Sequence, residues 1–168
     1  MVATPRTWVV GEVVTAAYMN AEIKDQFTDL IAAWTSYTPV WSSSGTAPAI
    51  GNGTLAGRYK LVGKTCHVVF GQTMGTTTTF GTGTYGWSLP FTAANPGGTD
   101  ANFGWSGAAR GHAGSWYNGA AVVLKNTSVA RIYPHKETPN TEWAATVPTT
   151  WAAATTNYLH GAITYETA

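Results

Sequence analysis

The chain is short of charge. Only 10% of its 168 residues are Asp, Glu, Lys or Arg, against about 25% in an average soluble domain. No apolar run approaches the ~20 residues of a membrane-spanning helix, so membrane insertion is not expected. Disordered chains combine few aromatic residues with high net charge, whereas this chain is 12% aromatic with a net charge of +1. The composition therefore favours a folded β-protein with an uncharged surface, as suits subunits that pack together.

Cysteine and clustered metal ligands are equally scarce. The single cysteine, Cys66, excludes an intrachain disulfide, and its apolar neighbours predict a small buried side chain. No pair of histidines has a metal-ligand spacing, since each lies in a different segment: His67, His112, His135 and His160. We therefore expect no metal or other cofactor. The pI near 7.9 indicates no nucleic-acid partner, and the N-terminus lacks a signal-peptide pattern, which favours assembly in the cytoplasm.

One helix is predicted, over residues 15–33. Thr15 is a suitable N-cap, because its hydroxyl can accept a hydrogen bond from a free backbone N–H. Four apolar residues recur at spacings of four, four and three and form one stripe: Met19, Ile23, Phe27 and Leu30. A helix this short is marginal by itself in water. We therefore expect the stripe to pack on the β-region, a symmetry mate or a docking partner, and take it as the candidate assembly interface.

After Trp34 the composition changes to Thr, Ser, Gly and aromatic residues. Alternating apolar residues predict a β-hairpin over residues 54–74. Similar patterns predict further strands at 84–89, 103–113, 116–125, 128–133 and 157–166. Many short strands with turn signals between them are typical of an antiparallel β-sandwich or jelly-roll. The predicted organisation is an attachment and trimerisation segment, 1–34, followed by a β-sandwich domain, 35–168.

Motifs for catalysis are weak. Residues 81–86 match G-x-G-x-x-G, but Pro90 blocks the helix that a dinucleotide site needs, so a β-turn is the better interpretation. Glu137 and Glu142 flank a turn and could face each other, as the two acids of a glycan-cleaving enzyme do. Solvated turn charges are the simpler explanation for this pair. The chain also lacks the G-x-S-x-G nucleophile elbow. We therefore expect a protein that is not an enzyme.

Aromatic residues of the second half are the candidate ligand-binding residues. Four of them fall in or beside predicted loops: Trp105, Trp116, Tyr117 and Trp143. Flat rings on an uncharged surface could stack on sugar rings. The alternative is that they fill the core or a subunit interface, where large aromatic side chains are also enriched.

Two groups of motifs resemble the virion proteins of tailed bacteriophages that infect actinobacteria. The leader contains PRTW at 5–8, GEVVTAA at 11–17, Asn20 and KDQ at 24–26. The following region contains WTSYTPVW at 34–41, GNGTLAGRY at 51–59 and GKT at 63–65. The resemblance implies a virion surface component, a tail-fibre or head-decorating protein that is often a homotrimer. It brings no catalytic residues and does not distinguish head from tail.

The sequence thus favours a tail-fibre or receptor-binding protein. Such a chain would trimerise, be carried by other virion proteins through its N-terminus, and contact a host cell-surface glycan. The first alternative is a capsid decoration protein that stabilises the head and binds no ligand. The second, from a different class, is a glycan-cleaving enzyme that uses Glu137 and Glu142.

Overall fold

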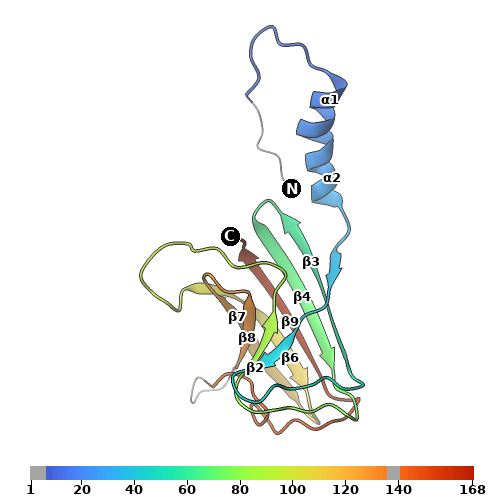
Figure 1. The fold of residues 1–168 in the computed structure, drawn as a ribbon, viewed down its shortest axis with the longest axis vertical. Coiled ribbons are helices and arrows are strands. Elements are labelled where there is room, and N and C mark those ends of the chain that lie inside the picture. The colour runs from blue at the N-terminus through green and yellow to red at the C-terminus, as the bar shows by residue number, and fades with distance from the viewer. Residues whose placement is uncertain (1–6, 136–140) are drawn as a thin grey trace. The chain divides into compact units, whose positions relative to one another are not determined.

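The computed structural model describes residues 7–135 and 141–168, and the chain divides into two compact units between Trp34 and Thr35 (Figure 1). The N-terminal unit contains a helical run made of α1 (Ala16–Met19), η1 (Asn20–Lys24) and α2 (Asp25–Ile31). Thr15 caps it as predicted, because the backbone N–H of Tyr18 donates to Thr15 Oγ1 at 3.3 Å. The predicted short helix is present, and only its middle departs from regular α-helical hydrogen bonding. There a wide turn brings the backbone N–H of Asp25 to the carbonyl of Asn20, five residues earlier.

The second unit is mainly β. Its strands are β1 (Thr35–Tyr37), β2 (Trp41–Ser43), β3 (Thr54–Val62), β4 (Thr65–Thr73), β5 (Tyr85–Ser88), β6 (Gly104–His112), β7 (Trp116–Leu124), β8 (Val129–Pro134) and β9 (Tyr158–Glu166). They form one nine-stranded sheet in the order β1-β3-β4-β9-β6-β7-β8-β5-β2. All the pairings between these strands are antiparallel.

The connection between β1 and β2 requires this sheet to curl. These strands are its two edges, and in a flat sheet eight strand spacings of ~4.8 Å would separate them by roughly 38 Å. Only residues 38–40 join them, and the four Cα steps from Tyr37 to Trp41 span at most about 14 Å. The two halves of the sheet therefore face each other around a common core. This is the sandwich-like antiparallel architecture, preceded by one short helix, that the sequence predicts.

The core consists of the inward-facing residues of the strands. Cys66, Val68 and Phe70 are buried along β4, and every second residue of β9 is buried as well. The predicted burial of Cys66 is confirmed, and that burial raises the pKa of its thiol. One polar contact crosses the interior, where Trp87 Nε1 of β5 donates to Gln72 Oε1 of β4 at 2.7 Å. Because β4 and β5 are not neighbours in the sheet, this bond connects its two facing halves.

The predicted hairpin and the five predicted later strands are all present. The hairpin is β3 and β4, joined by a turn in which Gly63 has a φ of 59°, a conformation that glycine adopts without strain. The other five correspond to β5, β6, β7, β8 and β9, with ends that differ by one residue at most. The glycine motif at 81–86 leads into β5, not into a helix.

Candidate functional site: a groove on the outer sheet face

The four predicted binding residues do not share one surface. Trp143 is 0% exposed, so its assignment to a binding surface is wrong. Its ring fits over the inner face of β6 because glycine leaves room there: a Cβ added at Gly111 would lie 2.9 Å from it. Trp105 and Tyr117 are half-buried and pack against the core, since both point inward from their strands. Only Trp116, which is 54% exposed, presents its ring to solvent.

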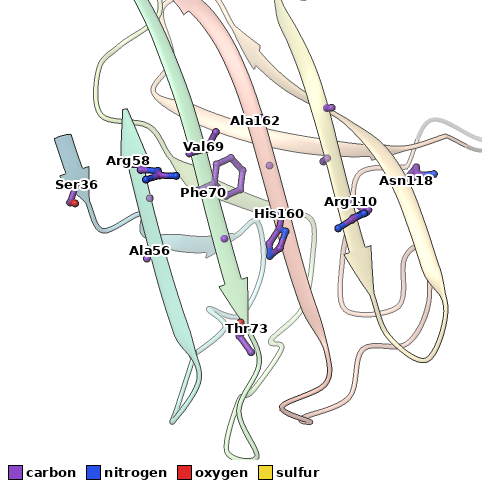
Figure 2. A pocket seen from close by; sticks show the side chains of 15 residues that line it. Ser36, Ala56, Arg58, Val69, Phe70, Thr73, Arg110, Asn118, His160 and Ala162 are labelled. Carbon is purple, nitrogen blue, oxygen red and sulfur yellow. The ribbon is translucent and has the colours of Figure 1, made fainter. Parts of the chain in front are cut away.

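The face that carries Trp116 contains an open groove of about 950 Å³ (Figure 2). It crosses β3, β4, β9 and β6, with β1 and β7 at its margins. Its floor is low because the outward residues there are among the smallest: Ala56, Gly71, Ala108 and Ala162. Longer side chains flank this floor, so the hollow follows from the choice of residue size on the outer face.

Strand register places the polar residues of the groove in a row. Gly71 of β4 pairs with His160 of β9, which pairs with Arg110 of β6, which pairs with Asn118 of β7. Adjacent members of this row are thus one strand spacing apart, ~4.8 Å. Arg58 lies on β3, at the other side of the floor, and Figure 2 shows His160 between the two arginines. Three strand spacings, about 14 Å, separate the strands that carry Arg58 and Arg110.

An aromatic cluster adjoins this row, two residues further along the same strands. The rings of His112 and Tyr158 stack with centroids 5.4 Å apart, and Trp116 meets both edge-on, at 5.0 Å and 5.7 Å. The guanidinium carbon of Arg110 lies 4.3 Å from the centre of the Trp116 ring, a cation–π contact. Arg110 therefore connects the groove to the exposed aromatic cluster.

The groove is electropositive. Among the described residues that line it are Arg58, Arg110 and His160, and none is Asp or Glu. The surrounding domain has the same sign. Residues 35–168 hold seven of the nine Lys and Arg and four of the eight Asp and Glu, which leaves +3 there and −2 in residues 1–34. A concave surface of one sign attracts ligands of the opposite sign.

Sequence reasoning missed this groove. The alternation of apolar residues predicts the strands, but nothing in the local pattern shows that Arg58, Arg110 and His160 share a surface. The strand order brings them together, because β9 inserts between β4 and β6. The signal that was available is one small residue at an outward position in each of four strands: Ala56, Gly71, Ala108 and Ala162.

The carboxylate of Glu142 belongs to a different part of the surface. It accepts hydrogen bonds from Arg131 at 2.8 Å and from the hydroxyl of Tyr133 at 2.8 Å. Burial would raise the pKa of Glu142, but hydrogen bonds from Arg131, Thr84 and Tyr133 outweigh it and lower that pKa. A general acid needs a raised pKa, so Glu142 is unsuited to that role. It forms an ion pair with Arg131 instead. Its predicted catalytic partner, Glu137, lies outside the described residues.

The predicted apolar stripe of the helix is exposed in the single chain. Met19, Ile23, Phe27 and Leu30 are between 42% and 61% exposed, and the helical run buries none of its residues. The preceding segment adds four more exposed valines: Val9, Val10, Val13 and Val14. Such an accumulation of exposed apolar side chains is typical of a surface that another molecule covers.

Comparison with protein-family models, with curated proteins and with solved structures finds no match. Within residues 7–135 and 141–168, no three His, Cys, Asp or Glu side chains gather in a way that could hold a metal ion. None of the helices in that part of the chain has the length and apolar character needed to cross a membrane.

Proposed function

We propose that this chain is a bacteriophage virion structural protein of the tail-fibre or receptor-binding type. Three copies would associate, dock onto the particle through residues 1–34, and display the β-domain for contact with the host surface. The observation that carries the proposal is the exposed apolar stripe of Met19, Ile23, Phe27 and Leu30, in a unit separate from a complete β-domain. The motif resemblance to actinobacterial phage virion proteins supplies the biological setting.

Covering the stripe would favour association. Complete burial of one such side chain contributes about 1.5–3 kcal/mol, and these four are roughly half exposed in the single chain. Covering the remainder would contribute about 1 kcal/mol for each residue, or ~4 kcal/mol for each chain. An isolated helix of this length is marginal, so association would also stabilise the helix itself. Symmetric assembly of identical chains is the common solution for soluble oligomers.

The β-domain, in contrast, needs no partner to complete its core. Its interior is filled by its own side chains, including Trp41, Trp87 and Trp143. A domain of this kind folds independently and can project from an anchoring segment. The exposed apolar stripe lies in the N-terminal unit, whereas the β-domain has a complete core of its own. This separation supports attachment to the particle through the N-terminus.

The groove favours the receptor-binding type over capsid decoration. A decoration protein that only stabilises the head needs no solvent-facing hollow flanked by arginines and rings. Such a hollow suits a protein that contacts a ligand. We therefore propose a location on the tail, with head decoration as the alternative that particle labelling would reveal.

Deletion of residues 1–34 tests the attachment role. A phage lacking the gene would be complemented with full-length chain or with residues 35–168, and purified particles would be assayed by quantitative mass spectrometry. Circular dichroism of the truncated protein should still show a folded β-domain, while incorporation into particles should be lost. Incorporation of the folded fragment at normal occupancy would show that the docking surface lies in residues 35–168.

A further inference from the structure

We propose that the outer-face groove binds an anionic polysaccharide, a glycan strand that carries carboxylate or phosphate groups along its length. This deepens the proposed function by giving the chemical class of the surface ligand, and it rests on that function only for the ligand's source. The site consists of Arg58, Arg110 and His160 over a floor of Ala and Gly, with Trp116 and Tyr158 beside it.

The size of the groove suits a chain of sugar units. Its volume of about 950 Å³ is at the upper end of the range of about 300–1,000 Å³ found for ligand sites. The groove is open and extends across several strands, so a strand of linked rings could enter and leave at its ends. Ala56, Ala108 and Ala162 keep the floor low, and the His160 ring lies beside Gly71, 3.3 Å from where a Cβ of that residue would be.

The spacing of the two arginines favours a ligand with repeated charges. A guanidinium group binds carboxylate or phosphate through two parallel hydrogen bonds. Arg58 and Arg110 arise from strands about 14 Å apart, so a ligand with two separated anionic groups can engage both at once. A polymer with an anionic group on successive units is such a ligand, while Asn118 and Ser36 at the margins offer hydrogen bonds to hydroxyl groups.

The aromatic cluster favours a glycan over a single-stranded nucleic acid. Proteins that hold single strands stack successive bases on several rings along a basic groove. Here the exposed rings gather at one end, where Trp116, His112 and Tyr158 pack against each other. The one exposed ring among the described residues that line the groove is the His160 imidazole, 5.3 Å from the Tyr158 ring centre. Among those lining residues no exposed aromatic ring follows it toward Arg58, so successive bases would find no series of rings, whereas one exposed indole beside a cation is sufficient to seat one sugar face.

Direct binding measurements with matched probes test the inference. Calorimetry would compare oligogalacturonate with its methyl ester, and phosphomannan with unphosphorylated mannan, using the full chain. Each pair keeps the sugar backbone and changes only its charge. We expect one or both anionic members to bind, their neutral partners to bind at least about tenfold more weakly, and added salt to weaken the binding. The member that binds identifies carboxylate or phosphate as the recognised group.

Four variants locate the binding site. Arg58→Gln and Arg110→Gln should each lower affinity about tenfold or more, since each removes a charge-assisted hydrogen-bond donor. Ala162→Leu should also lower affinity by filling the floor while leaving the charge unchanged. The control, Lys64→Gln, removes the same charge from an exposed hairpin turn outside the groove and should bind as the wild type does. Circular dichroism would establish that each variant is folded.

Several results would overturn the inference. It is refuted if neither anionic glycan binds, if the neutral partners bind equally, or if Lys64→Gln loses as much affinity as the arginine variants. Tighter binding of oligo(dT) than of both glycans would reassign the groove to nucleic acid. Incorporation into particles distinguishes a failure of the glycan-binding proposal from a failure of the proposed function. The groove variants should incorporate normally, so a failure to bind glycan would leave the attachment role intact.

Discussion

Replacing Trp143 and Trp116 by alanine, one at a time, should lower the stability of the β-domain by very different amounts. The sequence makes both of them candidate ligand-binding residues, but Trp143 is 0% exposed and Trp116 is 54% exposed. Trp143 packs against Trp151, with ring centroids 5.6 Å apart, and its backbone N–H donates to the carbonyl of Ile132 at 2.7 Å. Trp143→Ala should therefore destabilise the β-domain strongly, whereas Trp116→Ala should destabilise it much less.

The size of each effect follows from the contacts. A buried aromatic ring removes about 150–250 Å² from water, which at ~25 cal/mol per Å² corresponds to roughly 4–6 kcal/mol. Measured aromatic-to-alanine changes in cores fall at about 3–5 kcal/mol. Trp143 Nε1 has no hydrogen-bond partner among the described residues, so no hydrogen bond is lost as well. Trp116→Ala loses its cation–π contact with Arg110 and its edge-on contacts with His112 and Tyr158, together about 1–2 kcal/mol at a half-exposed site.

Thermal and urea denaturation followed by circular dichroism would measure both changes. For a domain of this size, a loss of about 3–5 kcal/mol lowers the melting temperature by roughly 10–20 °C, and a loss of about 1–2 kcal/mol by roughly 3–8 °C. The reasoning is refuted if Trp116→Ala destabilises as much as Trp143→Ala, because the ring of Trp116 would then be part of the core. It is equally refuted if Trp143→Ala melts like the wild type.

Two further predictions concern the helix and the ion pair. Phe27→Asp should convert a trimer into monomers in sedimentation experiments, since a carboxylate in the covered stripe costs several kcal/mol. Thr28→Asp, on the opposite face of the same helix, should not, and a persistent Phe27→Asp trimer would show that the stripe is not the interface. The pKa of Glu142 is lowered in the folded protein, so its ionised form stabilises the fold fully at a pH above the ordinary pKa of 4.5. This contribution is lost as the pH falls through the folded-state pKa. Glu142→Gln should therefore be less stable than the wild type in denaturation at pH 7, and this difference in stability should disappear at acid pH. An equal difference at both pH values would contradict the ion pair between Glu142 and Arg131.

Local patterns were sufficient to predict most strands. In β4 and β9 the buried and exposed residues alternate throughout, and a period of two residues is visible in sequence. The edge strands β1 and β2 were not predicted, because each has only three residues and an alternation that short is indistinguishable from a loop. The wide turn at η1 was missed for a similar reason, since it leaves the apolar spacing of the helix unchanged.

The site was harder to predict than the fold. Trp143 follows a predicted turn, and only the glycines of β6 and β7 beneath its ring explain its burial. The groove depends on which strands are neighbours, a property of the complete sheet. Arg58 and Arg110 are 52 positions apart in the chain, and they flank one surface because β4 and β9 lie between their strands. The exposed stripe of the helix, in contrast, could be predicted, because it depends only on local spacing.

The location of the chain on intact particles tests the central claim most directly. Gold-labelled antibodies against residues 35–168 would be applied to purified particles of the phage that encodes the chain and viewed by electron microscopy. The account predicts label on the tail fibres or tail tip, with no label on particles that lack the gene. Label spread over the head would establish the decoration role instead, and the absence of label from particles that contain the gene would contradict a displayed virion protein.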